Sequence, residues 1–215
     1  MKKPKLIVFD FDGTLADTSP GIINSHKYAN VKMGKNEPDN DFLFGLIGGP
    51  LLETYEKKFN FPKENAIEAV RIYRERYAVE GIKEVELYDG MANTLKELKQ
   101  RGYIVAVATL KAEKFAAPML KSLDIAQYFD VIHGVDDQDT RTKASLIELC
   151  MSELNVSKED TILVGDSSHD AIGAQTANVG FIAATYGFGF KSVSDAEKFN
   201  PISIIDSPNK LLEIL

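Results

Sequence analysis

The sequence predicts an α/β fold in which a parallel sheet, flanked by helices, is interrupted by an all-helical insertion. Two observations predict the sheet: short apolar runs of strand length recur along the chain, and helix-length amphipathic stretches separate them. A third observation predicts the insertion, because no apolar run of strand length occurs between residues 16 and 84. The expected domains are therefore a core of residues 1–15 and 85–215 and a helical cap of residues 16–84.

The apolar runs lack the alternation of half-exposed strands, which indicates strands buried on both faces. They occupy residues 6–9, 104–108, 131–132, 162–164, 181–183 and 202–205. Helical patterns lie near residues 91–101, 112–123, 143–154 and 169–177. Such alternation is typical of right-handed crossovers, so we expect a Rossmann-like sheet whose functional groups gather at the carboxyl ends of its strands.

The insertion is predicted to contain three helices. The first begins with Ser19 as N-cap and Pro20 as the first helical residue, the second begins at Pro50, and the third spans about 63–80. Gly48 and Gly49 precede Pro50 and predict a loop whose backbone can approach a ligand closely, although an ordinary turn between helices has the same signature.

Composition excludes several classes of protein. Of the 215 residues, 44% are hydrophobic and 27% are charged, which is typical of a folded globular chain and not of a disordered one. The 25 basic and 32 acidic residues give a net charge of −7, so we expect no nucleic-acid partner and no membrane partner. The one cysteine, Cys150, leaves no disulfide within the chain.

The N-terminus shows no export signal. Three lysines among the first five residues precede only four apolar residues before Asp10, too few for the apolar region of a signal peptide. No stretch approaches the roughly 20 apolar residues that a membrane helix requires. We therefore expect a cytoplasmic protein.

Asp10 and Asp12 follow the first apolar run. Carboxylates two residues apart at a strand end project to similar sides, and a buried pair of like charges is costly unless a cation lies between them or one is protonated. Such a pair suits a nucleophile and an acid/base, although an Asp-Gly turn is the simpler structural interpretation. A calcium loop is excluded, because its fifth and twelfth positions would be Thr14 and Gly21.

Thr109 and Leu110 follow the second apolar run, where a hydroxyl and backbone N–H groups can bind phosphate oxygens. Lys143 begins a predicted helix, where its charge opposes the helix dipole, and a bound anion would remove that conflict. Taken alone, Thr109 could only cap the next helix and Lys143 could be a solvated surface residue.

Asp166 ends the fourth long apolar run and Asp170 follows one helical turn later, so that both carboxylates can face one site. Hard oxygen ligands suit Mg²⁺, which binds few carboxylates, several waters and a substrate phosphate. A helix cap and a surface aspartate are the structural alternative. Polar residues at successive strand ends of one parallel sheet nevertheless favour a single site over separate coincidences.

These residues, in their order, resemble the four motifs of the haloacid dehalogenase-like superfamily. The resemblance rests on Asp10-Phe11-Asp12-Gly13-Thr14-Leu15, Thr109, Lys143 and Gly165-Asp166-Ser167-Ser168-His169-Asp170. It covers the whole chain, with the insertion as a cap, and is strongest to the branch similar to phosphoglycolate phosphatases. The chain departs from the common pattern at Leu110, so a phosphate contact there would come from the backbone N–H.

The resemblance implies a phosphatase that hydrolyses a small phosphorylated metabolite, such as 2-phosphoglycolate, through an aspartyl-phosphate. It implies that Asp10 is the nucleophile and Asp12 the acid/base. Thr109, Leu110 and Lys143 would bind the phosphate oxygens.

The resemblance also implies a Mg²⁺ cofactor. Its ligands would be Asp10, the backbone carbonyl of Asp12 and Asp166, with Asp170 in support. The loop of Gly48 and Gly49 would bring the cap to the substrate.

The same residues would also suit other functions. A phosphomutase similar to β-phosphoglucomutase, a nucleotidase and a pyrophosphatase would use the same residues. A phosphoaccepting signalling module similar to response-regulator receivers is the non-enzymatic alternative. The expected partner is a small phosphoester, and the chain is expected to be a monomer or a homodimer.

Overall fold

The computed structural model describes residues 3–48, 50–136 and 140–215. It divides into two compact units, one of Met1–Asp17 with Glu86–Leu215 and one of Thr18–Val85. We call them the core unit and the cap unit and describe each by itself. Gly49, one of the residues expected to contact substrate, lies outside the described residues.

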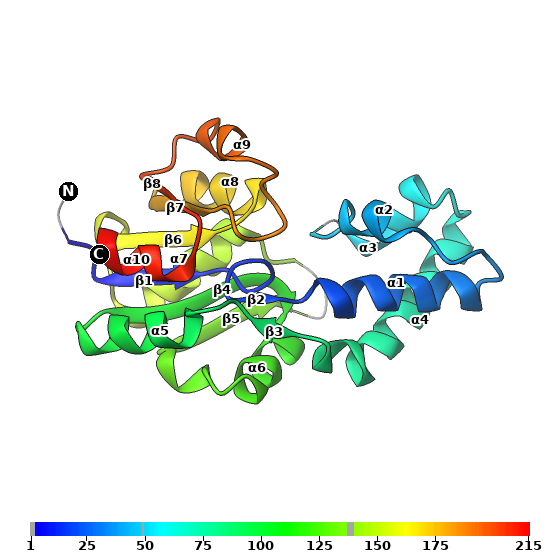
Figure 1. Ribbon diagram of the computed structural model, residues 1–215, viewed down its shortest axis with the longest axis horizontal. Coiled ribbons are helices and arrows are strands. Elements are labelled where there is room, and N and C mark those ends of the chain that lie inside the picture. The colour runs from blue at the N-terminus through cyan, green and yellow to red at the C-terminus, as the bar shows by residue number, and fades with distance from the viewer. Residues whose placement is uncertain (1–2, 49, 137–139) are drawn as a thin grey trace. The chain divides into compact units, whose positions relative to one another are not determined.

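The core unit is built on a six-stranded parallel sheet with the strand order β5-β4-β1-β6-β7-β8 (Figure 1). Its strands are β1 (Leu6–Phe9), β4 (Ile104–Ala112), β5 (Val131–Val135), β6 (Thr161–Gly165), β7 (Gly180–Ala184) and β8 (Ser203–Ile205). All four residues of the central strand β1 are buried, as continuous apolar runs indicate. The predicted α/β fold with a parallel sheet is confirmed.

Helices cover both faces of this sheet. They are α5 (Met91–Gln100), α6 (Glu113–Ser122), α7 (Lys143–Leu154) and α8 (Ser168–Ala177). Leu146 of α7 and Ala174 of α8 share one buried cluster with Leu6 and Val8 of β1. Figure 1 shows α5 and α6 on the opposite side of the sheet from α8.

Short elements complete the core unit. Two short helices, α9 (Val193–Glu197) and α10 (Leu211–Ile214), lie in the C-terminal part. Single 3₁₀ turns occur at Ala126–Tyr128, Lys158–Asp160 and Pro208–Lys210. Sequence periodicity did not predict them, because elements of three to five residues carry too few positions for a helical pattern.

Strand β4 is longer than its apolar run. The run predicts a strand that ends at Ala108, whereas β4 continues to Ala112 and its register with β5 shifts between these two residues. Its pairing with β1 ends at Val107, so the extension has a partner strand on one side only. Thr109 therefore lies within the strand and not beyond it, in the kind of irregular strand that often borders active sites.

A small antiparallel pair links the two ends of the insertion. Strand β2 (Ala16–Asp17) pairs with β3 (Glu86–Leu87), and Asp17 lies opposite Glu86. The sequence placed Ala16 and Asp17 in the insertion, but this pairing makes them part of the core unit.

The cap unit is helical. It contains α1 (Ser19–Lys32), α2 (Asn40–Phe44), α3 (Leu51–Glu53), a π-helical turn (Thr54–Lys58), α4 (Lys63–Val79) and a 3₁₀ turn (Gly81–Lys83). Helix α1 follows Thr18 and not Ser19, so its predicted start is wrong by one residue, because proline fits either of the first two helical positions. Helix α2 was not predicted, and its N-cap Asp39 accepts hydrogen bonds from the N–H groups of Asp41 and Phe42.

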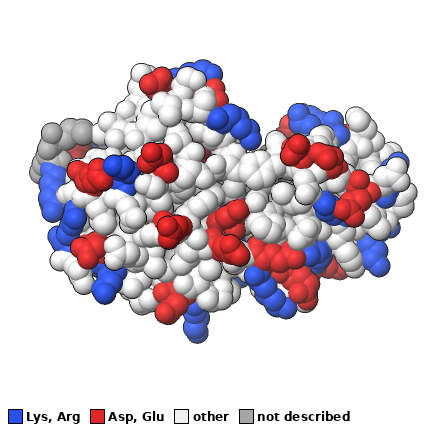
Figure 2. Space-filling view, viewed as in Figure 1, with Lys and Arg blue, Asp and Glu red and all other residues white. Residues whose placement is uncertain are grey.

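Charged side chains of both signs are mixed on the face shown in Figure 2. Within the cap unit, Arg71 of α4 pairs with Glu68 and Glu75 of the same helix, and Lys57 of the π-helical turn pairs with Glu53 at the end of α3. Such exposed pairs contribute little to stability. Every helix in the described part of the chain is too short or too polar to cross a lipid bilayer.

Candidate active site

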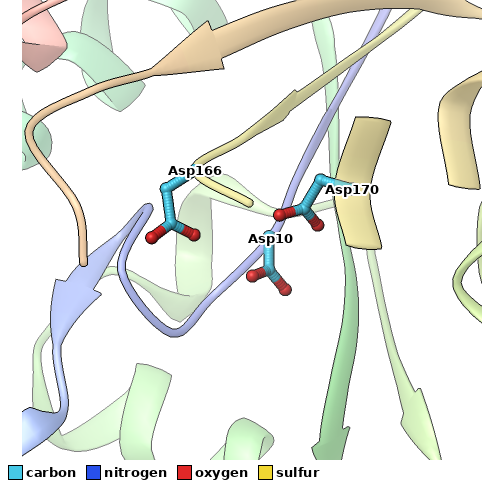
Figure 3. A group of neighbouring side chains, drawn as sticks. All are labelled: Asp10, Asp166 and Asp170. Atoms are coloured by element: carbon cyan, nitrogen blue, oxygen red, sulfur yellow. The ribbon is translucent and has the colours of Figure 1, made fainter. Parts of the chain in front are cut away.

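Three buried aspartates meet at the carboxyl ends of the central strands (Figure 3). Asp10 follows β1 and Asp166 follows the neighbouring strand β6, and the Asp10 N–H donates a hydrogen bond to the carbonyl of Val164, within β6, at 3.0 Å. Asp170 lies in the first turn of α8. One carboxylate oxygen from each aspartate lies within 4.8 Å of the other two. The structure thus brings together three of the four aspartates proposed from the sequence.

Lys143 lies among these aspartates. It is the first residue of α7, and its Nζ is 2.6 Å from Asp10 Oδ1, 2.8 Å from Asp170 Oδ1 and 3.0 Å from the Ala108 carbonyl oxygen. Its side chain is only 5% exposed, so it is no solvated surface lysine. Gly173 gives room for its stem, because a Cβ there would lie 2.3 Å from Lys143 Cγ. The sequence predicted a bound anion near Lys143 at the start of this helix. In the structure, two carboxylates of the protein itself, those of Asp10 and Asp170, lie there.

The electrostatics of this group reflect burial and mutual repulsion. Burial raises the pKa of Asp10 to about 6 against the opposing effect of Lys143, and the Asp170 and Asp12 carboxylates add to the rise. Burial, with repulsion from Asp170 and Asp10, raises the pKa of Asp166 well above its usual value. Burial disfavours the ammonium of Lys143, but its carboxylate partners Asp10 and Asp170 outweigh this and raise its pKa.

The loop after β7 holds Asp166 in place. The N–H groups of Phe188 and Gly189 donate to Asp166 Oδ2 at 3.0 and 2.8 Å. A Cβ on Gly187 would lie 2.4 Å from that oxygen, and one on Gly13 would lie 2.2 Å from it. Both glycines are therefore required for the close approach of two backbone segments to this carboxylate.

Asp170 is held by its own helix. Its Oδ2 accepts hydrogen bonds from the N–H of Ser167 at 3.0 Å and from the Ser167 hydroxyl at 2.6 Å, while Ser167 caps α8. The residue is fully buried. The sequence offered two interpretations of this region, a helix cap and a shared acidic site. The Asp170 carboxylate takes part in both.

Asp12 is not part of the group of three. Both of its carboxylate oxygens accept from Lys111 Nζ, at 2.8 and 3.1 Å. Sequence reasoning missed Lys111, because the predicted strand ended before it. With β4 extended, Lys111 lies two residues after Thr109, the spacing that places two side chains on the same face of a strand.

The remaining predicted residues, which carry no charge, are Thr109 and Leu110 on β4 and Gly48 in the cap unit. Thr109 is buried, and its Oγ1 accepts from the N–H of Lys111 at 3.1 Å, which leaves its hydroxyl hydrogen to be donated elsewhere. Leu110 is partly exposed on β4. Gly48 belongs to the cap unit, where φ is +89° and nothing described lies within 4 Å of the position of a Cβ.

The donor set of the three aspartates fits a hard divalent cation. All three donors are carboxylate oxygens, they are buried together, and two of them have raised pKa values that a bound cation would reverse. The site can therefore bind a metal ion.

Comparison with known proteins identifies the family. The sequence profile of the haloacid dehalogenase-like hydrolases matches residues 7–184. A 5'-nucleotidase from Pseudomonas aeruginosa is 37% identical over 85% of this chain and 83% of its own length. The pyrophosphatase PpaX of Halalkalibacterium halodurans is 32% identical over 97% of this chain and 95% of its own.

Two further similarities cover the chain from end to end. The tyrosine-protein kinase PtkA of Mycobacterium tuberculosis is 31% identical over all of this chain and 73% of its own length. The crystal structure of a putative phosphatase from Clostridium difficile superimposes with a TM-score of 0.92 at 34% identity, covering 100% of both chains. The chain therefore belongs to the haloacid dehalogenase-like hydrolase family and is a phosphatase of that family.

Proposed function

We propose that this phosphatase hydrolyses a small phosphomonoester through an aspartyl-phosphate on Asp10. The observation that carries the proposal is the contact of a buried lysine with a buried carboxylate at the centre of the sheet, at 2.6 Å between Lys143 Nζ and Asp10 Oδ1. An anionic nucleophile can approach a phosphate dianion only where positive charge compensates the repulsion. Lys143 supplies part of that charge, and an ion bound by the aspartates would supply the rest.

In the first step, an Asp10 oxygen forms a bond to phosphorus while the bond from phosphorus to the leaving oxygen breaks. Asp12, in its protonated form, gives its proton to the leaving oxygen, so that an alcohol departs. Lys143 exchanges its contact with Asp10 for a non-bridging phosphate oxygen, and the hydroxyl of Thr109 and the N–H of Leu110 donate to the others.

In the second step, Asp12 takes a proton from a water molecule as that water attacks phosphorus. The bond between phosphorus and Asp10 breaks, inorganic phosphate leaves, and both carboxylates return to their starting states with Asp12 protonated. One residue thus serves first as acid and then as base, which accounts for its place beside the nucleophile but outside the acidic group.

The proposed cofactor is Mg²⁺ held by Asp10, Asp166 and Asp170, with the backbone carbonyl of Asp12 as a further ligand. When bound, it would neutralise charge on the phosphate and on the three carboxylates. The loop of Phe188 and Gly189 would keep Asp166 oriented toward the ion through the two N–H groups that it donates.

We include the cap unit in the proposal as the part that selects the leaving group and limits access of water. Gly48 supports this role, because its positive φ and the open space beside its Cα allow the backbone to approach a ligand closely. Gly49 follows Gly48 in the sequence and is included in the proposal on that ground alone.

The substrate candidates are 2-phosphoglycolate, nucleoside monophosphates and inorganic pyrophosphate. The last two are favoured by the names of the Pseudomonas and Halalkalibacterium relatives. A phosphomutase differs by returning the phosphoryl group to a sugar, and a protein kinase such as the mycobacterial relative transfers it to tyrosine. Both alternatives predict little phosphate release to water.

The test is phosphate release from the two kinds of ester and from pyrophosphate, with purified protein and Mg²⁺. Asp10→Asn is expected to lower kcat at least about a thousandfold, since it removes the attacking group. The matched control is Asp195→Asn, which changes an exposed aspartate paired with Lys198 and is expected to leave kcat unchanged. Near-normal turnover by Asp10→Asn would overturn the proposal, as would a stable phosphoprotein formed from acetyl phosphate without turnover.

A further inference from the structure

Uncharged groups hold the Asp166 carboxylate. Lys143 pairs with Asp10 and Asp170, whereas the hydrogen bonds to Asp166 come from N–H groups of the loop after β7 and from a hydroxyl. That hydroxyl belongs to Thr14, whose Oγ1 donates to Asp166 Oδ1 at 3.4 Å, while the loop donates to Oδ2. Asp166 is therefore held between two segments, the turn after β1 and the loop after β7.

The side chain of Tyr186 joins these two segments. Tyr186 is the second residue after β7, and its hydroxyl donates to the carbonyl oxygen of Thr14 at 3.0 Å. Burial and repulsion from Asp166 raise the pKa of Tyr186, so this hydroxyl keeps its proton and remains a donor. The same loop also binds the backbone of Asp166, because the Phe190 N–H donates to its carbonyl oxygen at 2.8 Å. The Tyr186 hydroxyl thus ties the loop to the turn that holds the other carboxylate oxygen of Asp166.

The aromatic ring of Tyr186 has a packing partner of its own. It meets the ring of Tyr88 at an interplanar angle of 67°, with 5.0 Å between the two ring centroids. Tyr88 follows β3, and its N–H donates to the Leu15 carbonyl oxygen at 3.4 Å. Tyr186→Phe keeps this aromatic contact and removes only the hydrogen bond to the turn. The contribution of the hydroxyl can therefore be measured separately from that of the ring.

The orientation of Asp166 matters because of the ion that it is proposed to bind. Mg²⁺ requires nearly octahedral geometry, so a carboxylate ligand that is free to turn must become ordered when the ion binds. The lost rotamer freedom opposes binding. Lys143 already restrains Asp10 and Asp170. The orientation of Asp166 depends instead on the two segments that Tyr186 joins.

We propose that Tyr186 is a positioning residue whose hydroxyl keeps the Asp166 carboxylate in the orientation that binds Mg²⁺. The proposal rests on the proposed function, because it takes Asp166 as a ligand of the metal ion. It gives Tyr186 no contact with the substrate or with the ion. The expected signature is a loss of Mg²⁺ affinity, with catalysis restored when the ion is in excess.

The test measures Mg²⁺ binding to the substrate-free protein by isothermal titration, for the wild type and for Tyr186→Phe. The dissociation constant is expected to rise about three- to tenfold, less than the roughly ten- to hundredfold that loss of a direct partner of a metal ligand causes. Phosphate release gives a second readout. The Mg²⁺ concentration for half-maximal rate should rise by the same factor, while kcat at saturating Mg²⁺ and KM for the ester should stay within about twofold of the wild type.

The matched control is Tyr103→Phe, which removes the same group from the same unit. The Tyr103 hydroxyl donates to the Leu215 carbonyl oxygen at 2.6 Å, so each variant loses one hydrogen bond from a tyrosine to the backbone. Tyr103→Phe is expected to leave Mg²⁺ affinity unchanged. Urea unfolding of both variants shows how much stability each substitution removes.

Wild-type Mg²⁺ affinity in Tyr186→Phe would overturn the proposal. So would an equal loss of affinity in the two variants, which would mean that lower stability alone weakens the site. A fall in kcat at saturating Mg²⁺ without a change in Mg²⁺ affinity would also overturn it, because the hydroxyl would then act at another step. Failure of the proposed function looks different: the wild type would bind no Mg²⁺, or Asp166→Asn would bind it as tightly as the wild type.

Discussion

The position of Asp166 depends on glycines, whose lack of a side chain lets the backbone approach its carboxylate closely. Its carboxylate lies where the turn at Gly13 and the loop of Gly187 and Gly189 approach each other. A Cβ on Gly187 would lie 2.1 Å from the Gly13 carbonyl oxygen, and a backbone oxygen cannot move aside as the end of a flexible side chain can. The position of this proposed metal ligand is therefore fixed by backbone packing.

Gly187→Ala is expected to weaken Mg²⁺ binding at least about tenfold, because the new methyl group displaces Asp166 or the loop that holds it. Isothermal titration of the metal-free protein with Mg²⁺ measures the effect. Gly45→Ala is the control, since its Cβ would meet only ordinary contacts at 3.4 Å or more. Unchanged affinity in a folded Gly187→Ala protein would contradict this role of the loop.

The two lysines show what a single residue does and does not reveal in a sequence. Lys143 could be proposed because its charge opposes the start of α7, a conflict visible without coordinates. Lys111 gave no such signal, because a lysine shortly after an apolar run is also common on a protein surface. Its contact with Asp12 joins positions 99 residues apart, which local pattern cannot indicate.

The cap helices bury an aromatic cluster around His26 of α1. Its Nδ1 lies 3.1 Å from the Tyr55 hydroxyl oxygen, and its ring centroid is 4.7 Å from that of Tyr73. Burial lowers the pKa of His26 to about 4, because the charged imidazolium would be desolvated among these rings. The packing of helices α1 and α4 thus depends on a neutral histidine.

The cap unit is expected to lose stability as pH falls from about 6.5 to about 4. In this pH range His26 binds a proton in the unfolded chain but not in the folded protein. The free energy of unfolding therefore falls by at most about 3 kcal/mol. Urea unfolding followed by circular dichroism at several pH values tests this. His26→Phe, which keeps a ring, should flatten the pH dependence, and His169→Gln, which changes an exposed histidine, should not. Identical profiles for wild type and His26→Phe would refute the assignment.

The pattern of apolar residues predicted where the long strands and helices lie better than it predicted where they end. The buried strands β1, β6 and β7 follow directly from their apolar runs, but β4 extends past its run by four residues of mixed character. Those residues are held by pairing with β5, which is a tertiary contact. The π-helical turn Thr54–Lys58 also depends on a tertiary contact, because its Tyr55 packs against His26. Hydrophobic periodicity in the sequence therefore did not predict it.

The insertion leaves and rejoins the core unit at a single pair of residues. Asp17 and Glu86 are partners in the β2–β3 pair, so the ends of the segment between them lie about 5 Å apart. Such a close pair of ends is what lets a fold accept an inserted unit without distortion.

Replacing Thr18–Val85 with a short Gly-Ser linker is therefore expected to leave a folded core unit. The sheet, the three aspartates and Lys143 all remain in such a chain, so it should unfold cooperatively and still bind Mg²⁺. Phosphate release should fall markedly, if the cap acts as proposed. Circular dichroism and Mg²⁺ titration give the answer, with Asp166→Asn in the shortened chain as the control for the binding site. An unfolded product would show that the core unit depends on the cap.

The order of apolar runs and helical patterns was enough to specify a parallel sheet, because strands buried on both faces must be apolar throughout and helices must alternate with them. It was also enough to propose Asp10, Asp166 and Asp170 for one site, since parallel strands end at a common edge. Only the tertiary structure decided that Asp12 pairs with Lys111 and that a glycine loop encloses Asp166. These contacts join segments distant in sequence, and their energies arise from burial that exists only after folding.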